Sequence, residues 1–333
     1  MVPVVAKRKD VGTSWHTQAK HALMHEFISK EVRVANRLSY YERLFWMDLT
    51  AGDGAGAHGG EWHRACSPGI LAHNAATTTK QPVVVVLYEK DRATYGRLVA
   101  NLAAQLSPMG YIQGIDGWWR LDGARVMLRA LNEDGRTARV DYLRTKDAVL
   151  VLNDPNSITG FAMRPGFTKE VDGRVKGLRV LSTLGCNVSG IKRARLNREG
   201  TLPLGGGLAV MSLTERNSWF ELINEQAQSL PERHDLLLVC FDRDRDQWAY
   251  LVSQPRRWRE NDETRAEVQK AFAGVGRTAR MAWYRRSEGV EGGPESDQFK
   301  RLKDELFYTK SELHEQANTP LPFDGTQERG DAV

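Results

Sequence analysis

The segment 44–54 constrains the fold of this 333-residue chain more than any other segment. An apolar run, Leu44–Met47, ends in the carboxylate Asp48 and continues into a turn that contains Gly52 and Gly54. An apolar strand that leads into a glycine-rich turn is typical of parallel α/β sheets, where the turn closely approaches a bound ligand. We therefore predict that this turn is a cofactor loop.

The rest of the chain alternates between apolar strands and helical segments. We expect strands near residues 44–48, 82–88, 124–128, 147–152, 178–184, 236–241, 248–252 and 279–285, and helices near 13–37, 91–106, 214–229, 262–273 and 297–316. The segment 57–80 is interpreted as a long polar insertion. This alternation predicts an α/β fold with a Rossmann-like, mostly parallel sheet and helices on both faces.

The composition changes along the chain predict four regions. Residues 1–12 are expected to form a flexible basic arm, and residues 13–255 a Rossmann-like domain. Residues 256–316 are interpreted as a C-terminal extension that contributes to substrate binding, and the polar residues 317–333 as a disordered tail.

Several features predict a cytoplasmic protein without membrane association. The longest apolar run, Val83–Leu87, is far shorter than the ~20 residues that a membrane-spanning helix needs. The N-terminus places its basic residues after a short apolar stretch, which is the reverse of a secretory signal. Cys66, Cys186 and Cys240 are widely spaced and predict no disulfide framework.

The net charge of +5 favours a polyanionic partner, and we expect nucleic acid, with DNA preferred over RNA. The run Arg256-Arg257-Trp258 mixes cations with an aromatic ring, which suits a nucleic-acid backbone with unstacked bases. These three residues are therefore candidates for substrate binding. The alternatives are a solvated basic surface around a packed tryptophan, and a protein partner in place of nucleic acid.

The chemistry of the glycine turn favours S-adenosylmethionine (SAM) over a nicotinamide cofactor. The segment Gly52–Ala57 matches the GxGxxA pattern of dinucleotide sites, but the residues that follow do not resemble the helix start on which a pyrophosphate would lie. Asp48 and Asp53 suit the sulfonium and ammonium groups of SAM better than a phosphate. We expect Asp48, Thr50, Gly52 and Gly54 to bind the cofactor.

Glu89 follows the apolar strand 82–88 and is the expected partner of the ribose hydroxyl groups. A ribose would be present in SAM and in a nicotinamide cofactor alike, so Glu89 does not distinguish between them. The alternative is that Glu89 caps the helix expected at 91–106.

The sequence Asn153-Asp154-Pro155-Asn156 ends another apolar strand and supplies the candidate catalytic residues. It resembles the Asp-Pro-Pro-Tyr motif of methyltransferases that modify exocyclic amines, although Asn156 stands where that motif has its second proline. Asn153 or Asp154 would accept a hydrogen bond from the amine, and the carbonyl of Asp154 or Pro155 would accept a second. An ordinary strand-ending turn is the alternative.

An extruded base also needs an aromatic surface on which to stack. Phe161, Trp118 and Trp119 are the candidates for this role. Four further residues, His58, His63, Cys66 and His73, crowd the segment 57–80, but their spacing matches no zinc motif and we expect no metal.

The ordered motifs of residues 14–160 resemble the three-Cys-motif partner (TcmP-like) family of class I SAM-dependent methyltransferases. The resemblance includes the His-Thr…Lys-His pattern of 16–21, the glycine turn, Ser67-Pro68, Glu89 and Asp154-Pro155. It is looser for a family of rRNA large-subunit adenine methyltransferases. The family implies SAM as the cofactor and implies that Lys20 and His21 line the site, with Lys20 at the cofactor.

We interpret the chain as a SAM-dependent methyltransferase that acts on nucleic acid, with the exocyclic amine of adenine in DNA as the target. An RNA methyltransferase and a degenerate methyltransferase-like module that binds nucleic acid or a protein are the alternatives. A nicotinamide-dependent oxidoreductase is a further one.

Overall fold

The computed structural model describes residues 15–56, 61–77, 80–154, 163–164, 166–175, 177–184, 230–243, 246–255, 262–274, 279–285, 288 and 296–306. The strands are β1 Arg43–Asp48, β2 Val83–Tyr88, β3 Ile112–Gln113, β4 Trp119–Leu121, β5 Val126–Leu131, β6 Asp147–Asn153, β7 Gly177–Leu184, β8 His234–Arg243, β9 Asp246–Pro255 and β10 Arg280–Tyr284. The helices are α1 Trp15–Arg37, α2 Trp62–Ala65, α3 Ser67–Thr77, α4 Arg92–Leu106, α5 Phe167–Arg174, α8 Asp262–Ala273 and α9 Asp297–Leu306. None of the described helices is long and apolar enough to cross a bilayer.

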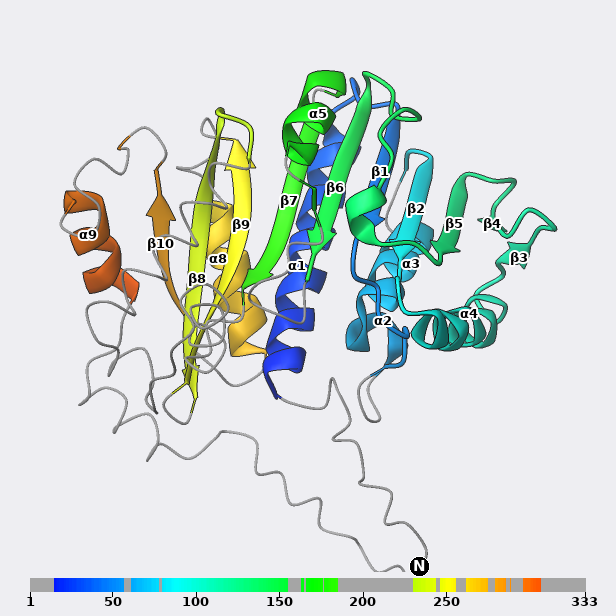
Figure 1. The fold of residues 1–333 in the computed structure, drawn as a ribbon, viewed down its shortest axis with the longest axis horizontal. Helices are drawn as coiled ribbons and strands as arrows, with labels where there is room; N and C mark the ends of the chain where they lie inside the picture. Colours follow the sequence, from blue (N-terminus) through cyan, green and yellow to red (C-terminus); the bar gives the residue numbers. More distant parts are fainter. Residues whose placement is uncertain are drawn as a thin grey trace, which may run out of the picture.

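All the strands form one ten-stranded sheet in the order β10-β8-β9-β7-β6-β1-β2-β5-β4-β3 (Figure 1). The neighbours from β7 to β5 pair in parallel, whereas β9 is antiparallel to both β7 and β8. From β1 the chain adds β2 and β5 on one side and then returns to add β6 and β7 on the other. The strand order therefore reverses between β1 and β6, which is where open α/β sheets bind ligands.

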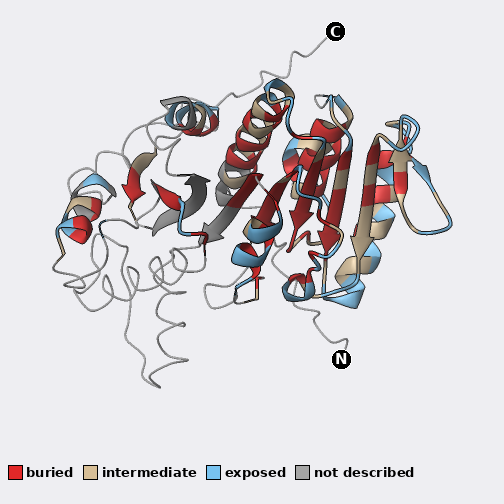
Figure 2. Cartoon of the chain, turned by 90° about the horizontal axis from the view of Figure 1, so that it is seen from above, coloured by how far each residue is buried: buried red, intermediate tan, exposed pale blue. Residues whose placement is uncertain are grey.

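Helices cover both faces of this sheet, as predicted. The helices α1, α3, α4 and α8 share one apolar core with alternate strand residues such as Leu44 and Trp46. The helices α5 and α9 lie on the other face, in a core that contains Phe45 and Met47. Figure 2 shows the central strands buried between these layers. Successive side chains of β1 point to opposite faces of the sheet, so this one strand contributes to both cores.

The interpretation of 57–80 as a polar insertion is wrong. Helices α2 and α3 lie in this segment, and α3 buries Ile70, Leu71, Ala72 and Ala75 against the sheet. Gly69 allows α2 and α3 to meet, because a Cβ at this position would overlap the carbonyl of Trp62. The segment is thus the helical connection from β1 to β2. The polar residues on either side of α3 make its apolar side difficult to recognise from the sequence.

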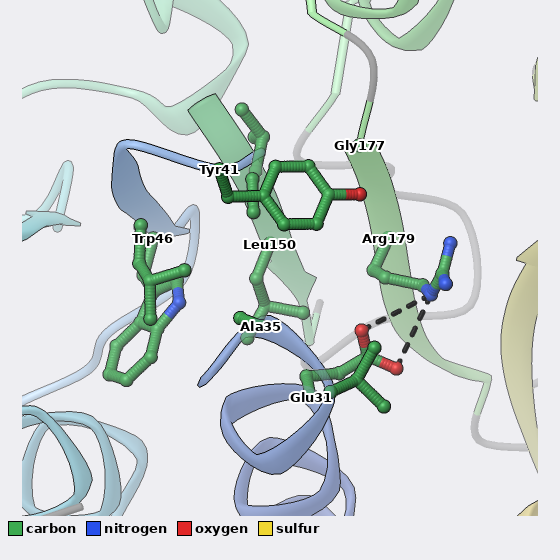
Figure 3. Close-up of a pocket in the computed structure, with 11 residues that line it drawn as sticks. Glu31, Ala35, Tyr41, Trp46, Leu150, Gly177 and Arg179 are labelled. Carbon is green, nitrogen blue, oxygen red and sulfur yellow. Dashed lines mark hydrogen bonds and ion pairs between the residues drawn. The ribbon is translucent and has the colours of Figure 1, made fainter. Parts of the chain in front are cut away.

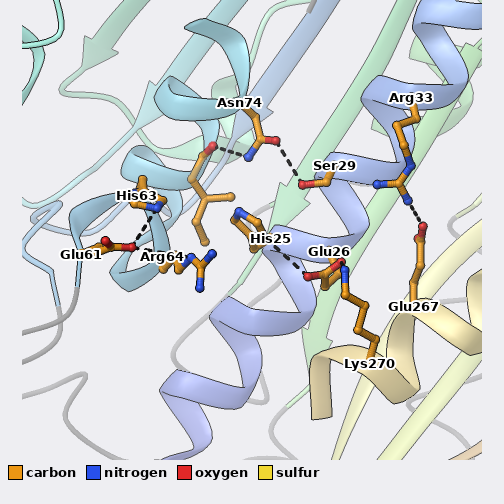
Figure 4. A network of polar contacts seen from close by, with 11 residues as sticks. His25, Glu26, Ser29, Arg33, Glu61, His63, Arg64, Asn74, Glu267 and Lys270 are labelled. Atoms are coloured by element: carbon orange, nitrogen blue, oxygen red, sulfur yellow. Dashed lines mark hydrogen bonds and ion pairs between the residues drawn. The ribbon is translucent and has the colours of Figure 1, made fainter. Parts of the chain in front are cut away.

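Polar contacts join α1 to α3 on one side and to α8 on the other (Figure 4). Ser29 of α1 donates to the Asn74 side chain of α3 at 3.2 Å. Lys270 of α8 pairs with Glu26 at 3.0 Å, and Arg33 pairs with Glu267. Because these pairs are partly exposed, each contributes little to stability on its own, but together they define how α8 lies on α1.

A second set of contacts joins α1 to the start of the parallel strands (Figure 3). Arg179 of β7 pairs with Glu31 of α1 at 3.2 Å. Tyr41 lies against Gly177, where a Cβ would overlap the phenol. This position therefore admits only glycine without a shift of the tyrosine.

The remaining expectations divide into three groups. The structure confirms most of the helix expected at 13–37 and the helices expected at 91–106 and 262–273. It also confirms the strands expected at 44–48, 82–88, 147–152, 178–184, 236–241, 248–252 and 279–285. The helix expected at 214–229 lies outside the described residues, as does the part of 297–316 beyond 306. The sequence did not reveal α5 or the small strands β3 and β4, and β5 begins two residues later than expected, because Asp122 and Ala124 adopt positive φ in the preceding turn.

Candidate functional site

The three polar strand ends lie along the same edge of the sheet, as the sequence predicts. Asp48 is the last residue of β1 and is in register with Leu87 of β2 and Leu152 of β6. Glu89 follows β2 directly, and Asp154 follows β6. The strand order β6-β1-β2 therefore places these carboxylates on three adjacent strand ends, at the switch point of the sheet.

The glycine turn after β1 has the conformation for which glycine is needed. Gly52 and Gly54 have φ of +65° and +64°. A Cβ on Gly54 would lie 2.7 Å from the Leu98 side chain of α4. Its carbonyl accepts a hydrogen bond from the Trp62 indole at 2.9 Å, and the Asn101 side chain donates to the carbonyl of Asp53 at 2.8 Å. The turn is therefore held by α2 and α4 in one conformation.

Asp48 is an unusual carboxylate because it is almost fully buried, with 1% of its surface exposed. Its Oδ1 accepts a hydrogen bond from the Thr50 amide at 3.0 Å, whereas its Oδ2 has no hydrogen-bond partner among the described residues. Burial raises the pKa of Asp48 to about 6, against the lowering effects of the Ser67 hydroxyl and the Thr50 amide. A buried acceptor without a donor is what a cationic ligand group would satisfy.

Asp53 does not share this environment. Its carboxylate accepts from the Ala55 amide at 3.0 Å and pairs with Arg97 at 3.5 Å on a partly exposed surface. The suggestion that Asp53 helps to receive a cation therefore has no support in the geometry, and Asp48 is the acid of this turn that remains available.

Asp154 is joined to α1 and to the glycine turn. The Lys20 ammonium forms an ion pair with the Asp154 carboxylate. The Asp154 amide donates to the Thr50 hydroxyl at 2.9 Å. Thr50 thus links the two candidate regions, since its own amide donates to Asp48. Neighbouring Asn153 is buried at 1% exposure.

His21 lies beside this ion pair. Burial lowers the pKa of His21 to about 3, with the Lys20 charge adding to the effect and the Asp154 charge opposing it. The imidazole is therefore neutral at physiological pH, and its buried Nδ1 has no hydrogen-bond partner among the described residues. The motif resemblance pointed to His21, but only the structure shows that it is a second buried polar group without a partner.

Glu89 remains compatible with ribose binding. Its carboxylate accepts a hydrogen bond from the Asp91 amide at 2.8 Å. The N-cap of α4 is Asp91, which accepts from the Thr94 amide at 2.8 Å, so the capping role suggested for Glu89 belongs to Asp91.

Several candidate residues lie away from Asp48 and Asp154 or outside the described residues. Five candidates lie outside the described residues: Pro155, Phe161, Arg256, Arg257 and Trp258. The stacking role suggested for Trp118 and Trp119 is not supported, because they lie at β4, which β5, β2 and β1 separate from β6.

The histidines of segment 57–80 do not form a metal site within the described part of the chain, where no group of three or more His, Cys, Asp or Glu side chains could hold an ion. The rings of His63 and His73 stack at 4.3 Å. The Cys66 thiol instead donates to the carbonyl of Gly54 at 3.5 Å, and burial raises its pKa to about 12. Cys66 therefore packs behind the glycine turn as a thiol.

Comparison with known proteins gives low similarities. No family model and no curated protein matches the chain. A Legionella pneumophila protein is 9% identical with a TM-score of 0.44, over 83% of this chain and 98% of that one. Trm1 from Pyrococcus horikoshii, in complex with SAM, is 12% identical with a TM-score of 0.39, over 76% and 58% of the two chains. An rRNA methylase from Streptococcus thermophilus is 11% identical with a TM-score of 0.34, over 70% and 96%.

The sheet itself defines the fold class. Its order β5-β2-β1-β6-β7-β9-β8, with only β9 reversed among these strands, is that of the Rossmann-like class I methyltransferase fold. The fold class predicted from the sequence is therefore confirmed, and the functional argument rests on the residues at its switch point.

Proposed function

We propose that the protein is a SAM-dependent methyltransferase. The observation that carries this proposal is the buried Asp48 carboxylate, whose Oδ2 lacks a partner at the glycine turn. A pyrophosphate would be repelled by this carboxylate, and the residues directly after the turn, Ala55 and Gly56, are not helical. The ammonium of a SAM molecule would satisfy the carboxylate instead. These features favour SAM over a nicotinamide cofactor.

SAM, when bound, supplies a methyl group on a positively charged sulfur. Asp48 would hold the cationic end of the cofactor, Gly52 and Gly54 would allow its close approach, and Glu89 would accept hydrogen bonds from the ribose. Asp154 would accept a hydrogen bond from the amine that receives the methyl group. The ion pair with Lys20 fixes the orientation of this carboxylate, so that positioning contributes much of the rate.

The substrate we propose is nucleic acid, with the exocyclic amine of adenine in DNA as the target and RNA as the second choice. Support comes from the net charge of +5 and from Asn153-Asp154 at the end of β6, which resembles the motif of amine methyltransferases. The same residues support membership of the TcmP-like family, and a protein partner remains the alternative to nucleic acid.

Methyl transfer and cofactor binding are measured separately to test this proposal. Purified protein is incubated with SAM carrying a tritiated methyl group and with DNA or RNA, beside Asp154→Ala and the control Asp297→Ala, which changes an exposed carboxylate on α9. We expect Asp154→Ala to reduce incorporation about 100-fold, the loss typical when a reacting group is no longer held in position, and Asp297→Ala to leave it unchanged.

Calorimetric titration with SAM and with NAD separates the alternatives. SAM binding that Asp48→Asn weakens, together with no transfer to any nucleic acid, would leave a degenerate binding module. Binding of NAD in place of SAM would contradict the proposal and identify an oxidoreductase.

A further inference from the structure

A groove of about 630 Å³ lies on the sheet face opposite α1, α3 and α4. Its floor is formed by apolar side chains of β1, β2 and β5, namely Phe45, Val84, Val86, Met127 and Leu131. A volume of this size lies within the range of ~300–1,000 Å³ that is usual for sites of small ligands. The groove is separate from the buried cluster around Asp48.

The groove exists because one crossover connection has no long helix. Helices α3, α4 and α5 lie in the connections β1–β2, β2–β5 and β6–β7. The connection from β5 to β6 contains only the 3-10 turn Gly135–Thr137 and an extended loop. Parallel sheets are normally covered on both faces, so this connection leaves apolar strand residues accessible from one side.

Aromatic rings form the walls of the groove. Trp118 comes from the turn between β3 and β4, and the guanidinium of Arg129 lies 5.8 Å from its ring centroid. Tyr142 comes from the loop before β6; its ring centroid lies 5.1 Å from that of Phe45, and its hydroxyl lies 3.0 Å from that of Tyr88. Two accessible ring systems therefore flank an apolar floor.

The charges at the groove favour an anion. Arg129 and Arg144 line it and have no ion-pair partner among the described residues. The other two arginines of the lining are neutralised: Arg43 by Asp147 at 2.6 Å, and Arg139 by Asp141. Glu133 also lines the groove and has no ion-pair partner among the described residues. Its negative charge offsets only one of the two free arginines, so a net positive charge remains.

The groove extends to the edge of the sheet that carries the proposed active site. Tyr88 lines it and is the last residue of β2, directly before Glu89. Leu131, the last residue of β5, also lines it. A chain molecule with its reactive group at Asp154 and a second unit in the groove would have to pass over the ends of β1 and β2.

We propose that this groove binds a nucleotide of the substrate strand, at a distance from the base that is methylated. The base packs between Trp118 and the apolar floor, and a phosphate lies at Arg129 and Arg144. Planar rings beside unpaired guanidinium groups are the combination that binds single-stranded nucleic acid without strong sequence preference. An acidic peptide would use the same cations but would gain little from the ring faces. The inference rests on the proposal that the substrate is nucleic acid.

The salt dependence of binding tests the proposal. A fluorescein-labelled single-stranded oligonucleotide is titrated with full-length protein at several salt concentrations, with fluorescence anisotropy as the readout. Each phosphate contact contributes about 0.7 to the slope of log K against log salt for a single strand. We expect Arg144→Gln to lower this slope by about that amount, and Trp118→Ala to weaken binding about tenfold at constant slope. Trp118→Phe should restore most of the affinity.

The matched control is Arg37→Gln, which removes the same charge at the far end of α1 on the opposite face of the sheet. An unchanged slope in Arg144→Gln, or a loss as large in Arg37→Gln, would overturn the proposal. Equal competition by a polyglutamate peptide that also depends on Trp118 would assign the groove to a protein instead.

The proposed methyltransferase activity is tested independently of the groove. SAM binding by calorimetry should be the same in wild type, Arg144→Gln and Trp118→Ala. Wild-type protein that binds SAM but no oligonucleotide overturns the groove proposal and leaves the methyltransferase in place. Protein that binds the oligonucleotide through Trp118 but no SAM supports the groove and refutes the enzyme.

Discussion

The variant Asp48→Asn should change how the stability of the protein depends on pH. The folded state raises the pKa of Asp48 from 3.8 to about 6 because the carboxyl group is buried. Between these two values the folded protein holds a proton that the unfolded chain has lost. The free energy of unfolding therefore falls as the pH rises from about 4 to 6 and stays low above it.

The magnitude follows from the size of the shift. At 1.36 kcal/mol for each pKa unit, the rise from 3.8 to about 6 lowers the free energy of unfolding at pH 7 by about 3 kcal/mol relative to fully protonated Asp48, and most of this loss occurs between pH 4 and 6. Asparagine keeps the volume and the acceptor for the Thr50 amide but does not ionise. Any stability lost by burying the asparagine amide is independent of pH. The pH-dependent part of the difference between wild type and Asp48→Asn therefore measures the effect of the Asp48 charge.

Urea denaturation of both proteins at pH 4, 5, 6, 7 and 8 measures this difference. We expect wild type to lose stability relative to Asp48→Asn across this range, and SAM to bind wild type more tightly as Asp48 ionises. Asp116→Asn is the control, because Arg120 lowers the pKa of Asp116 to about 2 and its effect has the opposite sign, below pH 4. A wild-type-to-variant difference that stays constant within about 0.5 kcal/mol would refute the reasoning about burial.

Three further variants test the packing around the site. Gly54→Ala should lower the free energy of unfolding in urea by more than about 1 kcal/mol, because its φ is +64° and its Cβ would lie 2.7 Å from Leu98. Gly96→Ala, where the added Cβ meets open space within α4, should raise Tm in calorimetry, since alanine is favoured over glycine in helices by about 1 kcal/mol. Arg43→Met should destabilise by about 3 kcal/mol in urea, because the buried Asp147 loses its guanidinium partner, and adding Asp147→Leu should recover most of that loss.

The sequence was sufficient for the parts of the fold that local patterns determine. The apolar runs that end at Asp48, Tyr88 and Asn153 are strands of one parallel sheet, and polar residues follow each of them. Because the carboxyl ends of parallel strands share an edge, the location of the site follows from the strand assignment alone. The prediction that Asp48 lies at the ligand-binding edge depends on this shared arrangement of the strand ends.

The sequence was insufficient wherever tertiary contacts decide the outcome. Helix α3 is mostly buried, but it is short and its flanks are rich in histidine and glycine, so its apolar side was not recognised. Trp118 was expected near the reactive amine, although the hairpin that carries it lies at the far edge of the sheet. The β5–β6 connection, which leaves the groove open, has no sequence signal beyond the lack of a helical pattern.

The ion pair between Lys20 and Asp154 shows why the site cannot be read from any one segment. Its two residues are 134 positions apart, and Lys20 reaches the strand ends only when α1 packs across the sheet. The contacts that hold α1 there, such as Glu31–Arg179 and Arg33–Glu267, lie along its length and not in the site. Because Asp154 pairs with Lys20, its carboxylate takes this orientation only in the fully packed domain. Substitutions at these distant pairs should therefore lower the proposed methyl transfer through the orientation of Asp154, with the cofactor turn left intact.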